Sequence, residues 1–199
     1  MSFRNRPRFL CDVDDVLANY VQGFVSAVIA TGVRPGLSQN HKFDEWDLSK
    51  SLKLTDEEDD KVYSLINMPG FATMLNPLPG AVEGVTKIME IADVFFLTSP
   101  LKSSPTWSYD RRLWLEKLFE DAKIVSTSEK HTVDGDFLCD DKPVHCEEWQ
   151  AEHPMGMSLM WATGRNEGQL PLGVALVGNW PLVYKLVEVR AKAMAAGMK

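Results

Sequence analysis

The sequence predicts an α/β fold, with a three-layer, Rossmann-like core built on a parallel β-sheet and a small helical cap inserted after the first strand. Short apolar runs alternate with longer amphipathic segments, which is typical of parallel strands joined by helices. Polar residues follow several of the apolar runs directly. A polar, helix-rich stretch separates the first apolar run from the second. We therefore expect the core at residues 1–17 and 77–199 and the cap at residues 18–76.

Composition and charge argue against several function classes. The chain has 199 residues, of which 45% are hydrophobic, enough to bury a sizeable core. The formal net charge of −7 and the lack of long basic runs argue against duplex nucleic acid as a partner. No apolar stretch approaches the roughly 20 residues of a membrane span, and the N-terminus lacks the apolar core of a signal peptide. Cys11, Cys139 and Cys146 lack metal-ligand spacing, so we expect a reduced, cytoplasmic protein.

The first elements are a buried strand and a helix. Residues 8–13 include an apolar run that ends in acidic residues, which predicts the first strand. Apolar residues recur with helical spacing over 16–31, before a glycine that ends the pattern. In the polar stretch that follows, Thr55 precedes an acidic run and has the residue type of a helix N-cap. This predicts a helix from Thr55 to Ile66 or Asn67 inside the cap.

Strands and helices then alternate through the second half of the chain. Each apolar run is short, whereas the helical segments carry apolar residues every three to four positions. The pattern predicts helices over about 81–91, 107–120 and 181–196, and strands over about 94–97, 123–125, 137–139 and 159–161. This alternation completes a parallel sheet covered by helices.

Acidic, hydroxyl and basic side chains collect where the expected strands end. Because the carboxyl ends of parallel strands share one edge of the sheet, where α/β proteins bind ligands, we expect these groups to meet there. Singly, each has a structural explanation, such as a helix N-cap or a solvated charge. Together, in this order, they predict a site that comprises Asp12, Asp14, Thr98, Ser99, Lys130, Asp140 and Asp141.

This set of groups is complete for phosphoryl transfer. Crowded carboxylates repel one another unless a cation relieves them, and Mg²⁺ prefers oxygen ligands. Asp12 can attack phosphorus. Asp14 can protonate the leaving oxygen and then deprotonate the water that hydrolyses the intermediate. Thr98 or Ser99 can bind phosphate oxygens, and Lys130 offsets negative charge. The pattern therefore predicts Mg²⁺-assisted hydrolysis of a phosphate ester through an aspartyl-phosphate.

The motifs resemble those of a known superfamily. Asp12-Val13-Asp14-Asp15-Val16, Thr98, Lys130 and Asp140-Asp141 are similar, in order, to the four motifs of the haloacid-dehalogenase-like (HAD) phosphatases. Longer strings, among them Val94-Phe-Phe-Leu-Thr-Ser-Pro-Leu-Lys102 and Leu138-Cys-Asp-Asp-Lys-Pro143, resemble the 5′(3′)-deoxyribonucleotidases. The likeness runs from about residue 8 to residue 143. It implies a HAD-like core and an enzyme that removes phosphate from deoxynucleoside monophosphates with Mg²⁺.

The resemblance also implies roles for individual residues. Asp12 is the expected nucleophile, and Asp14 is the expected general acid and base, which also offers its backbone carbonyl to Mg²⁺. Asp140 and Asp141 are the expected acidic pair at the metal, together with Asp12 and Asp14. Lys130, ten residues before Asp140, matches the catalytic lysine of the family.

Substrate-binding residues follow from the same resemblance. The positions that match phosphate-binding residues are Thr98, Ser99 and Lys102, and those that match aromatic residues around the base are Tyr20, Trp46 and Phe71. The relatives also imply a homodimer.

Three positions depart from the family pattern. Asp15 replaces the usual Gly and adds a negative charge beside the metal. Ser128 stands where relatives carry an Arg near the phosphate. Tyr20 replaces a Phe and adds a hydroxyl that needs a hydrogen-bond partner or solvent. We expect the change at Ser128 to affect affinity or substrate choice.

The expected function is that of a Mg²⁺-dependent 5′-nucleotidase for small-molecule nucleoside monophosphates. Because aromatic residues crowd the base slot, we expect a preference for pyrimidine deoxynucleotides such as dUMP or dTMP. One alternative is a phosphatase of the same mechanism for another small phosphomonoester. A second is a phospho-accepting receiver module, although in that fold the adjacent acidic pair precedes the phosphorylated Asp. A third is a nucleotide-binding module without catalytic activity.

Overall fold

The computed structural model describes residues 6–196, so the outermost residues of the expected core, 1–5 and 197–199, lie outside the described part. Its strands form one six-stranded sheet in which every neighbouring pair is parallel. The strand order is β3-β2-β1-β4-β5-β6, which places the first strand inside the sheet. The strands are β1 (Arg8–Asp12), β2 (Asp93–Thr98), β3 (Lys123–Ser126), β4 (Phe137–Asp140), β5 (Met157–Trp161) and β6 (Ala175–Val177). The predicted α/β class with a parallel sheet is confirmed.

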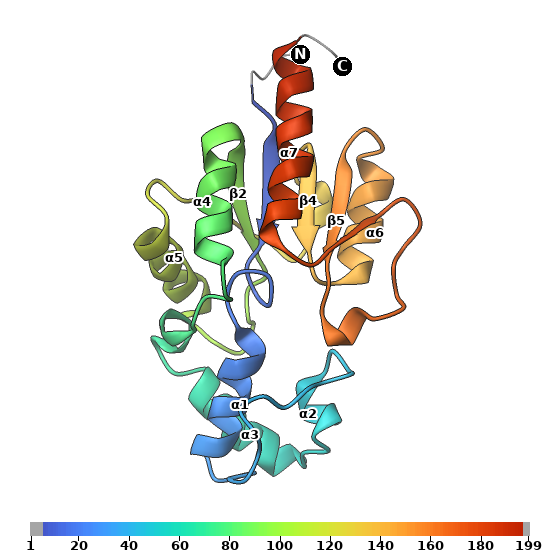
Figure 1. Cartoon of the computed structure of the whole chain (residues 1–199). Coiled ribbons are helices and arrows are strands. Elements are labelled where there is room, and N and C mark those ends of the chain that lie inside the picture. The colour runs from blue at the N-terminus through green and yellow to red at the C-terminus, as the bar shows by residue number, and fades with distance from the viewer. Residues whose placement is uncertain (1–5, 197–199) are drawn as a thin grey trace.

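Helices cover the two faces of the sheet. α4 (Ala81–Ile91) and α7 (Trp180–Ala195) lie side by side over one face (Figure 1). α6 (Pro143–Glu152) packs against β4 and β5 on the opposite face. α5 (Trp107–Leu118) completes the core and also contacts the segment that precedes α4. Helix, sheet and helix therefore form the three expected layers.

A second group of helices lies beyond the carboxyl ends of the strands (Figure 1). It comprises α1 (Tyr20–Ala30), α2 (Leu48–Ser51), α3 (Asp56–Ile66) and the 3₁₀ turn η1 (Phe71–Met74). We call residues 18–76 the helical insertion. The chain enters and leaves it at neighbouring points, because Ala18 and Pro77 form an antiparallel bridge and the Leu78 N–H donates to the Leu17 carbonyl at 2.6 Å.

Strand β1 has buried side chains on both faces. Phe9 and Cys11 belong to a large hydrophobic cluster that includes residues of α4 and α7. Leu10 points to the other face, where it packs with Leu138 and with Trp149 of α6. Apolar side chains at successive positions are what a strand buried on both faces requires. This is why the run at the start of the chain could be recognised as a strand.

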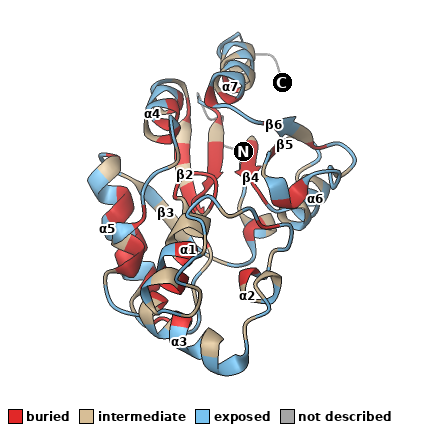
Figure 2. Ribbon diagram, turned by 60° about the horizontal axis from the view of Figure 1, so that its bottom comes forward, coloured by how far each residue is buried: buried red, intermediate tan, exposed pale blue. Residues whose placement is uncertain are grey.

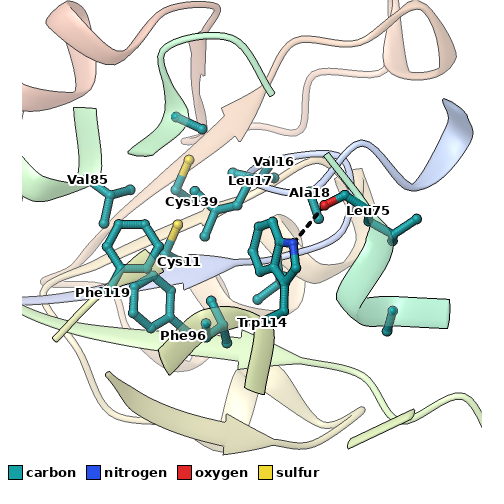
Figure 3. Close-up of a cluster of buried hydrophobic side chains, with 14 of the residues drawn as sticks. Cys11, Val16, Leu17, Ala18, Leu75, Val85, Phe96, Trp114, Phe119 and Cys139 are labelled. Atoms are coloured by element: carbon teal, nitrogen blue, oxygen red, sulfur yellow. Dashed lines mark hydrogen bonds between the residues drawn. The ribbon is translucent and has the colours of Figure 1, made fainter. Parts of the chain in front are cut away.

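The larger cluster continues from the sheet into the helical insertion. Buried residues occur in both regions in Figure 2, and Phe24 of α1 and Ile66 of α3 are fully buried. Figure 3 shows Trp114 of α5, whose indole N–H donates to the Leu75 carbonyl at 2.7 Å. The burial of these aromatic and aliphatic side chains fixes the insertion against the core.

Two aspects of the predicted elements are wrong. The helix expected over 16–31 begins only at Tyr20, where the Asn19 side chain caps it. Val16 and Leu17 are apolar because the turn after β1 is buried, and they are not helical. The sequence analysis also missed α2, α6 and β6. Within the described range, no helix is both long and apolar enough to cross a membrane.

Candidate active site

The turn after β1 carries three carboxylates into one cavity. Asp12 ends β1, and Asp14 and Asp15 follow in a tight turn in which the Asp15 N–H donates to the Ala18 carbonyl at 2.7 Å. The φ angle of Asp15 is +60°, in the left-handed region that Gly, Asn and Asp tolerate best. All three acids line a cavity of about 220 Å³ at the carboxyl ends of the strands. Open α/β sheets bind their ligands at this edge.

Lys130 lies between two buried carboxylates. Its Nζ is 2.6 Å from Asp12 Oδ1 and 2.6 Å from Asp140 Oδ2, and its side chain is only 2% exposed. Burial disfavours the charged lysine, but the two carboxylates outweigh burial and raise the pKa of Lys130 above its usual value. Asp140 also accepts the Lys142 backbone N–H at 2.9 Å and lies 3.1 Å from His145 Nδ1. Lys130 therefore links the carboxyl ends of β1 and β4 through two ion pairs.

The two carboxylates beside Lys130 differ in their titration. Burial, with a further contribution from the Asp140 carboxylate, raises the pKa of Asp12 to about 7, although Lys130 opposes the shift. Burial acts in the same direction on Asp140, but Lys130 and His145 outweigh it and lower the pKa of Asp140. Asp140 is therefore the permanent negative charge of the pair.

Arg111 of α5 contacts the second carboxylate of the turn. Its guanidinium donates from Nη2 to Asp14 Oδ1 and is fully buried, with the rings of Trp107 and Trp114 at 4.9 Å and 5.5 Å. Burial raises the pKa of Asp14, and Arg111 opposes that shift. The Asp14 side chain itself is 27% exposed and faces the cavity. Asp14 is thus held by Arg111 on the side of α5 and remains accessible from the cavity.

Arg165 of η3 (Gly164–Asn166) neutralises the remaining acids. Its Nη2 lies 2.7 Å from Asp15 Oδ2 and 2.9 Å from Asp141 Oδ2. The Asn166 amide donates to the Asp141 carbonyl at 2.7 Å. Burial, Asp12 and Asp140 raise the pKa of Asp141 well above its usual value, and Arg165 opposes this effect. The negative charge that Asp15 adds to the turn therefore has a positive partner.

These residues fit a divalent cation. Carboxylate oxygens of Asp12, Asp140 and Asp141 lie within 4.8 Å of one another, and all three residues are buried. Around them, the described part of the chain places five carboxylates against three buried cationic side chains, which gives two negative charges in excess when all five carboxylates are ionised. A hard cation with a preference for oxygen ligands matches both the donors and the charge.

The expected phosphate-binding residues differ in whether they line the cavity. Thr98 ends β2, is 1% exposed, and its Oγ1 has no hydrogen-bond partner within residues 6–196. Ser99 lines the cavity. Lys102 is exposed and does not line it, and Ser128 is likewise exposed and outside it. Thr98 does not line the cavity either, but it directly precedes Ser99, which does. A buried hydroxyl without a partner is costly, so Thr98 Oγ1 is an unpaired polar group beside the cavity.

Two of the three expected base-pocket residues line the cavity. Tyr20 and Trp46 do so, together with Leu48 of α2. Phe71 is buried and lines a different cavity, where its ring stacks on Trp107 at 6.5 Å. Trp107 lines the active-site cavity and meets Tyr20 edge-on at 5.9 Å. The aromatic wall of the cavity is therefore made by Tyr20, Trp46 and Trp107.

Sequence reasoning missed Arg111, Arg165, His145 and Trp107 as residues of this site. Arg111 and Trp107 were visible as parts of an amphipathic helix, but the pattern does not say which of their neighbours lies at the cavity. Arg165 contacts Asp15 across 150 residues of sequence, and no local pattern signals such a pair. His145 follows the acidic pair closely, which is a usable signal for a neighbour of Asp140.

Known proteins resemble this chain over most of its length. A model of the family “5′ nucleotidase, deoxy (Pyrimidine), cytosolic type C protein” matches residues 6–194. The human mitochondrial 5′(3′)-deoxyribonucleotidase is 33% identical over 142 residues, which cover 68% of this chain but only 62% of that protein. The human cytosolic-type 5′(3′)-deoxyribonucleotidase is 31% identical over 143 residues, covering 68% of this chain and 70% of its own length.

The fold has structural relatives as well. The HAD-type protein YfnB from Bacillus subtilis, solved with bound magnesium, has a TM-score of 0.59 and 11% sequence identity to this chain. The likeness covers 92% of this chain and 99% of YfnB. It shows that the six-stranded core has the HAD-like fold.

Proposed function

We propose, because the chain belongs to the family of 5′ nucleotidases, deoxy (pyrimidine), cytosolic type C, that it hydrolyses nucleoside monophosphates to nucleoside and phosphate. The single observation that carries this proposal is the Asp12–Lys130–Asp140 triad, which joins two adjacent parallel strands at the edge where Asp14 faces an aromatic-walled cavity. The predicted roles of these residues are consistent with their positions.

Asp12 is the proposed nucleophile. Its carboxylate oxygen attacks phosphorus, the bond between phosphorus and the ester oxygen breaks, and an aspartyl-phosphate forms. A pKa near 7 leaves a fraction of Asp12 protonated at neutral pH, and the adjacent Lys130 favours the reactive carboxylate. Lys130 also offsets the charge that the phosphate brings into the cavity.

Asp14 is the proposed general acid and base. Because burial raises its pKa, Asp14 can hold a proton and donate it to the leaving ester oxygen. The resulting carboxylate then takes a proton from the water that hydrolyses the aspartyl-phosphate. Arg111 holds Asp14 from the side of α5, so its free face stays directed at the cavity.

Asp12, Asp140, Asp141 and the Asp14 carbonyl are the proposed ligands of Mg²⁺. When bound, Mg²⁺ screens the carboxylates from the phosphate and stabilises the charge that develops in the transition state. Thr98 and Ser99 are the proposed partners of the phosphate oxygens, the first through its unpaired hydroxyl. Lys102 would have to move to reach the phosphate, because it lies outside the cavity.

The aromatic wall is the proposed base slot. Tyr20, Trp46 and Trp107 offer flat apolar surface, and the cavity of about 220 Å³ favours a small base over a large one. Pyrimidine deoxynucleotides such as dUMP and dTMP are therefore the proposed substrates. Burial, with a further contribution from Tyr63 of the insertion, raises the pKa of Tyr20 well above its ordinary value, so its hydroxyl stays neutral.

Phosphate release from a panel of nucleoside monophosphates and sugar phosphates, with and without Mg²⁺, tests this proposal. We expect Mg²⁺-dependent turnover that favours pyrimidine deoxynucleotides. Asp12→Asn should abolish turnover and preserve the circular dichroism spectrum. Turnover by the Asn variant would contradict the role of Asp12. Turnover of sugar phosphates alone would show that the proposed substrate class is wrong.

Assembly and location are further parts of the proposal. Three cysteines, Cys11, Cys139 and Cys146, are free and buried, which suits a reducing cytoplasm. A homodimer follows only from the family resemblance. Light scattering coupled to size exclusion would measure the mass directly, and a monomer at micromolar concentration would contradict the dimer.

A further inference from the structure

Arg165 connects the acidic edge of the core to the helical insertion. Its Nη2 donates to both Asp15 Oδ2 and Asp141 Oδ2, and its guanidinium carbon lies 4.6 Å from the ring centroid of Trp46. The residue is 7% exposed. A planar guanidinium can donate hydrogen bonds in its plane while its face stacks on an aromatic ring. Arg165 uses both capacities at once.

The contacts of Arg165 reach two separate segments of the insertion. Trp46 belongs to the loop between α1 and α2, and that loop also approaches η3, since a Cβ added to Gly164 would lie 3.9 Å from the Phe43 carbonyl. Asp15 reaches the start of α1, because its Oδ1 accepts the Val21 N–H at 3.0 Å. Arg165 thus contacts the loop that carries Trp46 and the Asp141 carboxylate directly. It reaches the first turn of α1 through Asp15.

Trp46 forms part of the wall of the active-site cavity. Its loop is anchored on either side by Phe43 and Leu48, which are buried in the core. Its immediate neighbours Glu45 and Asp47 are exposed, and the Trp46 ring is partly buried with the Arg165 guanidinium over its face. Within this anchored loop, the orientation of the ring therefore depends on the stacking contact with Arg165.

We propose that Arg165 is a positioning residue that sets the affinity of the site for the base of the substrate by holding Trp46 in the cavity wall. The ligand class is an aromatic base attached to a sugar phosphate. This inference rests on the proposed function and adds to it the residue that links the insertion to base recognition. Arg165 touches no reacting atom in this scheme, so its effect belongs mainly to KM.

The test compares two substrates that differ only by the base. Arg165→Met is assayed with a pyrimidine deoxynucleoside 5′-monophosphate and with 2-deoxyribose 5-phosphate, both with Mg²⁺. We expect kcat/KM for the nucleotide to fall about tenfold more than kcat/KM for the sugar phosphate, which lies between the contributions of an exposed and a fully desolvated cation–π contact. The difference should appear in KM. Equal losses on both substrates would overturn the inference and assign Arg165 to the metal site through Asp141.

Further variants isolate the contact with Trp46. In a Trp46→Ala background, Arg165→Met should no longer change the ratio between the two substrates, because the ring that it positions is gone. Arg165→Lys should restore only part of the ratio, since an ammonium cannot stack as a planar group. Arg112→Met, on the exposed side of α5, is the matched control and should change neither substrate. Additive effects of the Arg165 and Trp46 substitutions would contradict the inference.

A measurement without substrate separates this inference from the proposed function. Hydrogen exchange of the backbone amides of residues 41–47 should become faster in Arg165→Met and stay unchanged in Arg112→Met. A wild-type protein that hydrolyses the sugar phosphate but no nucleotide would refute the proposed function and, with it, the role in base affinity. Unchanged exchange in Arg165→Met would refute the positioning of the loop whatever the substrate.

Discussion

Replacing Lys130 with Met removes the positive charge between two buried carboxylates and keeps a side chain of similar length. In the wild type, Lys130 Nζ lies 2.6 Å from both Asp12 and Asp140, and none of the three side chains is more than 8% exposed. Removal of one partner from a buried ion pair costs about 3–5 kcal/mol, because the remaining charge is left without compensation. We expect Lys130→Met to lower the free energy of unfolding by about this amount in the absence of metal.

The size of the effect on the melting temperature follows from the chain length. At the midpoint, 199 residues unfold with an entropy of about 0.42 kcal/mol/K. A loss of about 3–5 kcal/mol then lowers Tm by about 7–12 °C. Thermal unfolding followed by circular dichroism in EDTA at pH 8 measures this shift. Mg²⁺ should reduce it, because a bound cation compensates the same carboxylates.

The effect of Lys130→Met should also depend on pH. The pKa of Asp12 in the folded wild type, about 7, is above its ordinary value, so the fold loses stability as the pH rises from that ordinary value to about 7, and the loss levels off above it. Without Lys130 this pKa rises further. The loss of stability should therefore be larger at pH 8 than at pH 5, where Asp12 is neutral in the variant.

Lys87→Met is the matched control for this experiment. Lys87 forms an exposed ion pair with Glu83 on α4, and such pairs contribute little to stability. A Tm of Lys130→Met within about 2 °C of the wild type, in EDTA at pH 8, would refute the conclusion that Lys130 compensates ionised Asp12 and Asp140.

Three further predictions test packing, capping and metal binding. Gly84→Ala should destabilise the protein by about 1–3 kcal/mol, since the new Cβ would lie 2.4 Å from Trp180, whereas Gly36→Ala meets no atom within 4 Å and should not; urea unfolding compares the two. Thr55→Ala removes the side-chain acceptor that caps α3 and should cost about 0.5–2 kcal/mol, with helix loss near residue 55 seen by hydrogen exchange. Mg²⁺ at 100 times its Kd should stabilise the protein by about 2.7 kcal/mol and raise Tm in a thermal shift assay, and no shift at millimolar Mg²⁺ would contradict the metal site.

The inner strands β1, β2, β4 and β5 were predictable because they are largely buried on both faces. A strand such as Phe9-Leu10-Cys11 needs apolar side chains at successive positions, and that run is visible in the sequence. α6 carries no comparable signal, since only Cys146 and Trp149 of its ten residues are buried. The start of α1 was misplaced because Val16 and Leu17 lie in a buried turn, and their apolar side chains extend the helical pattern toward the N-terminus.

The acidic half of the site was predictable, and its basic half was not. Each carboxylate directly follows a strand that the sequence predicts, so its place at the edge of the sheet follows from topology alone. Arg111 and Arg165 reach Asp14 and Asp15 across 97 and 150 residues, and which arginines of the chain do so depends on tertiary packing. The predicted catalytic, phosphate-binding and metal-binding roles remain predictions.

The inner position of β1 has a consequence for how the protein is made. Phe9 of β1 pairs with Val94 of β2 and with Phe137 of β4, so β1 is synthesised before either of the strands that flank it. Contacts between residues so distant in sequence slow folding, because the intervening chain loses entropy before they form. The contacts between Asp12, Lys130 and Asp140 cannot all form until residue 140 has been synthesised. Asp12 is therefore without its two buried partners while most of the chain is being synthesised.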